Sequence, residues 1–458
     1  MNTAGMTTGT DLHRLIDEAL PVLQTGRPDD SWLANIREKG RADALTLALP
    51  NRKQEAWRYT PVGFLEQTRY RALTDGPFKA LQLSDLDDLL LRGGTGPRLV
   101  FVNGYLAPRL SELSQNQRGI ALSSLSGGLG PVRQALRSRM GDSSRHADVF
   151  TALNSALMTD GALIRIAGDC MAETPIEILH VTVNSEEPGI CHPRHLIVVE
   201  EGGRAELIER YCSLGSGGVF TNAKIDISLD ASSTLQHQRL LEEGEDARHR
   251  SDLQVRLAEH SSYQLNQLAL GGAWSRSDIK VTFDGEGASA ELDGLMLARD
   301  GQLNDVHLDV RHEAPGCTSR ETFKGILEGK GKVVFDGRIL VAKDAQKTDA
   351  RLSNDNLMLS RSAEVDSKPQ LEIFADDVKC SHGTTVGELD ADMVFYLRSR
   401  GIPGGRAVQM LCQGFAQEVI DRIPNDGLRA RAGAMFEQRL AAPVQALAEA
   451  EEGVEHAG

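Results

Sequence analysis

The chain has 458 residues, of which 25% are charged and 40% hydrophobic, a composition that excludes an intrinsically disordered protein. Its 50 basic and 65 acidic residues give a net charge of -15, so nucleic acid is not expected as a partner. No stretch approaches the ~20 apolar residues of a membrane-spanning helix, and the N-terminus lacks a basic region followed by an apolar core. We therefore expect a cytoplasmic protein without a membrane partner.

The first ~95 residues have helical patterns. Apolar residues of the stretch 12–20 recur at helical spacing, and a second helix is expected from near Asp30. Residues 98–110 then indicate two short strands joined at Asn103 and Gly104, a strong hairpin signal.

The long middle region, residues 163–374, has a period of two, which is typical of half-buried strands. Ile225, Ile227 and Leu229, for example, alternate with polar residues. No amphipathic helix intervenes, so repeated βαβ units are excluded, and a sandwich, a barrel or a β-solenoid remains. The irregular spacing of the strands lacks a clean repeat, which by itself disfavours the solenoid.

Helical spacing returns after about Asp390, where Val408, Leu411, Cys412 and Phe415 share one helix face. The chain is thus expected to be helical, then rich in β-strands, then helical again. We place the boundaries at residues 1–160, 161–390 and 391–458.

Two minor motifs are assigned no chemistry. Cys191, His192 and His195 cluster in the sequence CHPRH, but Pro193 favours a surface loop. The sequence GKGK at residues 329–332 lacks the P-loop pattern, so ATP chemistry would have to come from a partner.

The six cysteines form no C-x-x-C pair, which disfavours a zinc ribbon or a complete cluster site within this chain. Cys380 and His382, however, are two residues apart, and in a strand they share one face about 6.6 Å apart along the chain, at ~3.3 Å per residue. Thiolate and imidazole both bind iron, copper or zinc. Taken alone, such a pair is more often structural than functional.

The surrounding motifs resemble the SufB/SufD family of iron–sulfur cluster assembly scaffolds. The matching pieces are EAWRYTPV at residues 55–62, NDNLML at 354–359, LEIFADDVKCSHGTTVG at 371–387 and FYLRSRGI at 395–402. Because SufB-like chains have His-Glu where this chain has His382-Gly383, the C-S-H-G form resembles the SufD branch. Thr384 replaces the more usual Ala, for which we expect little consequence because Thr fits a strand.

The resemblance implies a mainly β protein, with a right-handed parallel β-helix core and helical flanks. It implies a non-catalytic scaffold that pairs with a SufB-like chain, in a complex that also contains two copies of a SufC-like ABC ATPase. His382 matches the residue that the SufD branch offers to a nascent iron–sulfur cluster at the interface, and Cys380 is a candidate second ligand. The cluster would be transient, with no cofactor bound tightly by the isolated chain, and a homodimer of that chain is left open.

The resemblance also implies that the C-terminal helices dock the ATPase. The candidate docking residues are Phe395, Tyr396, Arg398, Arg400, Gly401 and Phe415. The alternative is that the apolar residues among them pack on the β core. A ligating imidazole must be neutral, so assembly is expected to weaken in acid.

Two other functions are left open. A β-helix enzyme acting on carbohydrates would usually show paired carboxylates and sugar-stacking aromatic residues. The nearest pair, Asp376 and Asp377, would point to opposite faces of a strand, and aromatic residues are only 5% of the chain. The other alternative is a SufB-like scaffold that itself accepts sulfur.

Overall fold

The computed structural model describes residues 14, 16–19, 31–73, 81–92, 96–113, 118–127, 148–183, 187–215 and 217–455. Of the predicted helix at residues 12–20, the described residues 14 and 16–19 are helical, and the remainder lies outside the described residues.

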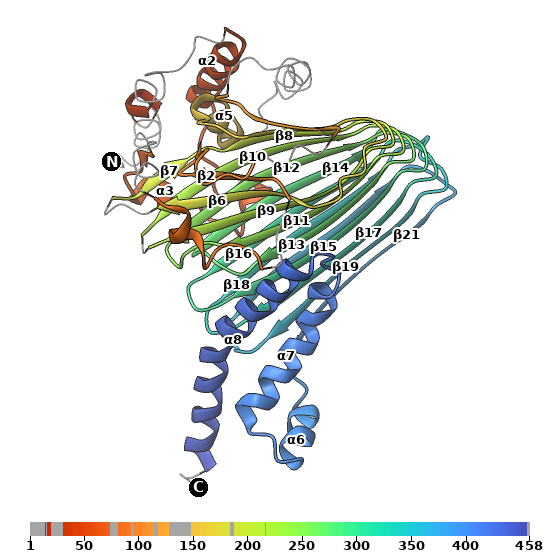
Figure 1. Ribbon diagram of the computed structural model, residues 1–458. Coiled ribbons are helices and arrows are strands. Elements are labelled where there is room, and N and C mark those ends of the chain that lie inside the picture. The colour runs from red at the N-terminus through yellow and green to blue at the C-terminus, as the bar shows by residue number, and fades with distance from the viewer. Residues whose placement is uncertain are drawn as a thin grey trace, which may run out of the picture.

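Two long β-sheets form the body of the molecule (Figure 1). Sheet A contains β4 (Ile120–Ser124), β5 (Ala162–Ile166), β8 (Arg194–Val199), β10 (Val219–Leu229), β12 (Arg248–Leu257), β14 (Trp274–Phe283), β16 (Leu303–His312), β18 (Lys332–Val341) and β20 (Glu364–Ile373), with β7 (Gly189–Cys191) paired to β10 and β1 (Arg71–Ala72) paired to β7. Sheet B contains β2 (Arg98–Val102), β3 (Tyr105–Leu106), β6 (Ile176–Val183), β9 (Arg204–Leu214), β11 (Thr234–Glu242), β13 (Ser262–Ala269), β15 (Ser289–Ala298), β17 (Thr318–Leu327), β19 (Asp349–Met358) and β21 (Lys379–Glu388).

The chain alternates between the sheets and advances by one strand in each sheet per turn. From β8 to β19, every strand pairs in parallel with the strand two places later in the sequence. This is a parallel β-solenoid, so the expected β-helix core is confirmed. The sequence shows no regular repeat because the number of residues per solenoid turn varies. Arg248 lies opposite Trp274, a shift of 26 residues, whereas Lys332 lies opposite Glu364, a shift of 32.

The main core fills the interior between the sheets, which we call the lumen. Alternation sends Ile225, Ile227 and Leu229 inward, as predicted, and all three are buried. In register with Ile225 are Leu253 and Ile279, so like residues stack along the solenoid axis. Each added turn therefore buries its apolar face against its predecessor.

Most of the N-terminal region covers the outer face of sheet A, whereas its short helix η3 (Leu83–Leu86) packs on sheet B. The helical elements of this region are α2 (Ser31–Thr46), η1 (Glu55–Trp57), α3 (Phe64–Gln67), η3 and α5 (Val149–Leu157). Trp57 and Phe150 pack with Phe220 and Trp274 of the sheet. The predicted hairpin is confirmed: β2 and β3 are antiparallel, and the turn residues Asn103 and Gly104 have φ angles of 52° and 81°.

Three helices follow the solenoid: α6 (Ala391–Ser399), α7 (Gly404–Ile420) and α8 (Asp426–Glu455). Helices α7 and α8 bury apolar residues on the outer face of sheet B, whereas α6 lies at the end of α7 farther from the sheets (Figure 1). The Asn425 side chain caps α8 by accepting the Leu428 N–H at 2.9 Å. Among the described residues, no helix is long and apolar enough to cross a membrane.

Candidate functional site

The last turn of the solenoid ends in two strands that are each paired on one side only. Strand β20 terminates sheet A and β21 terminates sheet B, and each is 10 residues long. Within the described part of the chain, no strand pairs with their outer edges. Such an edge can accept a strand from another chain.

Cys380 and His382 lie on the lumen side of β21. Cys380 is in register with Ala350 and His382 with Leu352, and both of these β19 residues belong to the lumen core. Cys380 is half-buried against that core, whereas His382 is exposed. The two side chains thus share one face of the strand, as their spacing predicts. We call the end of the solenoid formed by β20 and β21 the open end.

Burial raises the pKa of the Cys380 thiol, and the carboxyl groups of Asp349 and Glu321 raise it further. The thiol is therefore protonated at neutral pH. A metal ligand must be the thiolate, so binding through Cys380 would release a proton.

A hydrogen-bonded group joins the two sheets close to His382. Ser367 of β20 donates to Asn354 Oδ1 of β19 at 2.8 Å, and its Oγ lies 2.9 Å from Thr384 Oγ1 of β21. We call Asn354, Ser367 and Thr384 the terminal bridge. The motif NDNLML contains Asn354, but no sequence signal marked Ser367, and Thr384 was expected to have little consequence.

One chain supplies few ligands at this position. Within the part of the chain that the structure describes, no group of three or more His, Cys, Asp or Glu side chains is arranged to hold a metal ion. An iron–sulfur cluster needs about four ligands. Cys380 and His382 could therefore serve only as part of a site that another molecule completes.

Apolar side chains surround the open end. Ile373 and Phe374 at the end of β20 are 39% and 62% exposed, and Val386 of β21 is 49% exposed. Exposed apolar groups beside unpaired strand edges are typical of an interface.

The predicted docking residues divide into two sets. Phe395 and Tyr396 of α6 are 71% and 56% exposed, and Arg398, Arg400 and Gly401 at the end of α6 are exposed as well. Gly401 has a φ of 82°, the left-handed conformation that glycine adopts after a helix. All five residues are exposed on α6 or directly after it.

Phe415, in contrast, fastens α7 to sheet B. It is half-buried, its carbonyl accepts a hydrogen bond from Lys324 Nζ of β17 at 3.2 Å, and that ammonium lies 4.5 Å from the ring centroid. Lys324 also pairs with Glu418 of the same helix. Phe415 thus packs on the β core, which was the alternative to a docking role.

The CHPRH segment is not a surface loop, so that expectation was wrong. Cys191 ends β7 and His195 lies in β8, and both side chains and His192 are buried. The segment is enclosed because β7 and β8 both pair with β10. Burial lowers the pKa of His192 to about 3 and that of His195 to about 4.

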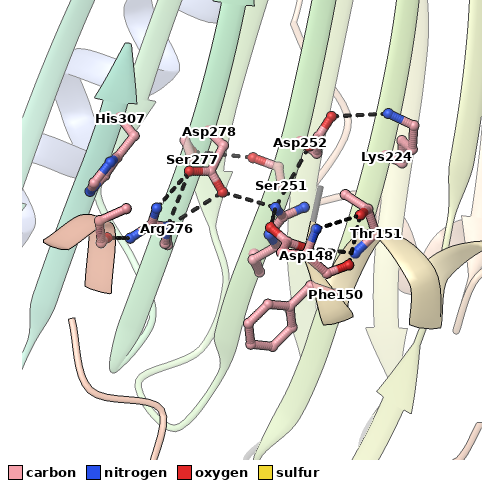
Figure 2. A network of polar contacts seen from close by, with 12 residues as sticks. Asp148, Phe150, Thr151, Lys224, Ser251, Asp252, Arg276, Ser277, Asp278 and His307 are labelled. Atoms are coloured by element: carbon pink, nitrogen blue, oxygen red, sulfur yellow. Dashed lines mark hydrogen bonds and ion pairs between the residues drawn. The ribbon is translucent and has the colours of Figure 1, made fainter. Parts of the chain in front are cut away.

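Figure 2 shows a second polar network, on the outer face of sheet A. Arg250 of β12 binds Asp148 of the α5 cap at 2.8 Å and Asp278 of β14 at 2.9 Å. Arg276 binds Asp278 and donates to the Ala56 carbonyl at 2.7 Å.

This network holds the EAWRYTPV segment against the solenoid. Arg276 lies 3.8 Å from the ring centroid of Trp57, which stacks on Phe150 at 5.3 Å. The two guanidinium groups lower the pKa of Asp278 despite its burial, so the network is ionised and mutually neutralised. Its role is to dock the N-terminal region.

Comparisons with known proteins agree with this architecture. The family model described as "SUF system FeS cluster assembly, SufBD core domain" matches residues 181–415. The iron-sulfur cluster assembly protein SufD of Escherichia coli is 35% identical over 398 residues, covering 86% of this chain and 90% of that protein. The SufBD family protein slr0076 of Synechocystis is 32% identical over 412 residues, covering 88% and 90%. Protein ABCI7 of Arabidopsis thaliana, a chloroplastic protein, is 27% identical over 407 residues, covering 87% and 84%.

Proposed function

Since the chain belongs to the SufBD family of iron–sulfur cluster assembly proteins, we propose that it is a SufD-like scaffold subunit and not an enzyme. The observation that carries the proposal is the exposure of His382, with Cys380 beside it, on the lumen side of an unpaired terminal strand. A ligand pair at that place is suited to a cluster assembled between two chains.

The partner at the open end is a second, SufB-like scaffold. The unpaired edges of β20 and β21 and the exposed Phe374 and Val386 support this assignment, because a second solenoid would continue both sheets and cover the apolar groups. The same surface would allow a homodimer when the isolated chain lacks that partner.

The nascent cluster is the cargo of this interface. His382 serves as one ligand or as the entry residue for iron, and Cys380 as a second ligand after losing its proton. The partner completes the coordination, and the finished cluster leaves.

Helix α6 docks a SufC-like ABC ATPase. Support comes from Phe395 and Tyr396, two large aromatic side chains that are exposed on α6. Helix α6 lies at the end of α7 away from the sheets (Figure 1). Exposed aromatic residues are typical of interface anchors. Dimerisation of two ATPase copies would strain the two scaffolds and open their interface for assembly.

The test is affinity purification of the tagged chain from the cells that make it, followed by identification of bound proteins. We expect a second SufBD-family scaffold and an ABC ATPase. A chain recovered alone, or only with copies of itself, would contradict the proposal. A persulfide trapped on this chain during turnover would instead support the sulfur-accepting role of a SufB-like scaffold.

A further inference from the structure

The terminal bridge connects sheets A and B beside the candidate cluster site. Ser367 belongs to β20, whereas Asn354 and Thr384 belong to β19 and β21. Thr384 is two residues beyond His382 on the same face of the strand. The bridge therefore holds the strand that carries His382 at a fixed distance from the facing strand.

Each side chain of the bridge makes at least two hydrogen-bond contacts. Ser367 has one hydroxyl proton, which it donates to Asn354 Oδ1 at 2.8 Å. Thr384 consequently supplies its own proton, to Ser367 Oγ at 2.9 Å or to the Asn354 carbonyl at 3.1 Å. Asn354 is fully buried and donates from Nδ2 to the Phe323 carbonyl of β17 at 3.2 Å.

Asn356 reinforces the bridge from β19. Its Nδ2 donates to Asn354 Oδ1 at 2.8 Å and to the Thr385 carbonyl of β21 at 3.4 Å. An edge strand has main-chain hydrogen bonds on one side only, so side-chain contacts of this kind matter more there than in the centre of a sheet. The polar group thus ties β21 to β17, β19 and β20.

We propose that the terminal bridge orients β21 so that His382 faces the incoming cluster, which makes Ser367 and Thr384 positioning residues of the assembly site. The inference rests on the proposed function. Thr384 thereby has a role beyond its preference for a strand conformation. Its hydroxyl acts on the assembly site through its contacts with Ser367 and Asn354.

The test uses the complete complex, purified through a tag on this chain, with iron and acid-labile sulfide counted and the visible circular dichroism spectrum recorded. The main variant combines Ser367→Ala with Thr384→Val, which removes both hydroxyl groups and leaves side chains of similar size. Two controls match it. Thr384→Ser keeps the bridging hydroxyl, and Thr385→Val removes a hydroxyl on the opposite face of β21, where Thr385 donates to Asp355 at 2.6 Å.

The double variant should recover its partners as the wild type does, yet lose cluster by about tenfold, the low end of what loss of an outer partner costs a metal site. Any remaining cluster should have an altered spectrum, which lower protein stability alone would not produce. Both controls should match the wild type in cluster content and spectrum.

Wild-type content and spectrum in the double variant would overturn the inference while leaving the proposed function standing. If the double variant fails to recover partners, Thr384→Val alone decides: loss of cluster in Thr384→Val but not in Thr384→Ser supports the inference, and equal content in both overturns it. A wild-type complex without any cluster would overturn the proposed function and the inference with it.

Discussion

His180 and His195 meet inside the solenoid with their Nε2 atoms 2.9 Å apart. The Ala162 N–H donates to His195 Nδ1 at 2.8 Å, so the ring hydrogen of His195 lies on Nε2 and is donated to His180. Both side chains are buried, and burial lowers the pKa of each, that of His195 to about 4. Both imidazoles are thus neutral in the folded protein.

The first prediction follows from this pair. His195 takes up a proton near pH 6.5 in the unfolded chain, whereas the folded chain excludes that proton until about pH 4, and the pKa of His180 is lowered in the same direction. Stability is therefore retained above pH 6.5 and falls as the pH is lowered toward 4, by on the order of 2 kcal/mol for His195 at pH 5. Thermal unfolding between pH 8 and 4.5 measures the effect.

The exposed His260 offers a matched control, because His260→Gln should leave the pH dependence of the melting temperature unchanged. A melting temperature that stays constant from pH 7.5 to pH 5 would refute the prediction.

A second prediction concerns Glu321. It is buried in register with Leu292 and Leu352, and neither carboxyl oxygen has a hydrogen bond of standard geometry among the described residues. Burial raises the pKa of this carboxyl to about 8. The folded state holds a proton that the unfolded state releases near pH 4.5, so the cost to stability grows from about pH 4.5 to about pH 8.

Glu321→Leu should accordingly raise the melting temperature, and the gain should be larger at pH 8.5 than at pH 5. Replacing the exposed Glu286 by Gln is the control and should change neither value. A variant that melts below the wild type at both pH values would show that the carboxyl has a structural role after all.

A third prediction separates docking from packing in the C-terminal helices. The double substitution Phe395→Ser and Tyr396→Ser should lower recovery of the ATPase about fivefold or more, because large aromatic residues dominate interfaces, and leave the melting temperature unchanged. Phe415→Ala should instead destabilise the protein by about 2 kcal/mol, since a half-buried ring is lost. If Phe415→Ala lowered recovery of the ATPase while the double substitution did not, the docking surface would lie on α7.

The sequence predicted the elements whose signals are local. Alternation located the strands, Asn103 and Gly104 located the hairpin, and the C-x-H spacing placed Cys380 and His382 on one face. The solenoid itself could not be read from the pattern, because turns of 26 to 32 residues blur the repeat. The family resemblance provided it.

The contacts that the sequence did not predict are made between residues that lie far apart along the chain. His195 became a core residue through its pairing with Ile225 of β10, 30 residues later, and not through any local signal. Ser367 acquired its role from Asn354 and Thr384, 13 and 17 residues away. Register fixes such contacts, and register follows only once the strands have been stacked.

A fourth prediction tests the open end as the scaffold interface. Val386→Lys places a charge among the exposed apolar groups of β21, and burying it without a partner should weaken scaffold association about a hundredfold or more. Recovery of the ATPase should persist, because α6 is a separate surface. Leu113→Lys, at an exposed apolar residue elsewhere on the molecule, is the control. Undiminished scaffold recovery with Val386→Lys would exclude this end of the solenoid.

If His382 contributes to a cluster site shared with a second chain, its removal should lower the cluster content of the complex without loss of partners. The complex is purified with wild-type chain, with His382→Ala, and with Ser381→Ala, which alters the opposite face of the same strand. Iron and acid-labile sulfide are then counted per complex. We predict equal recovery of partners in all three, with cluster content about tenfold lower in His382→Ala alone. Full recovery of partners together with unchanged iron and sulfide in His382→Ala would show that His382 is not part of the cluster site.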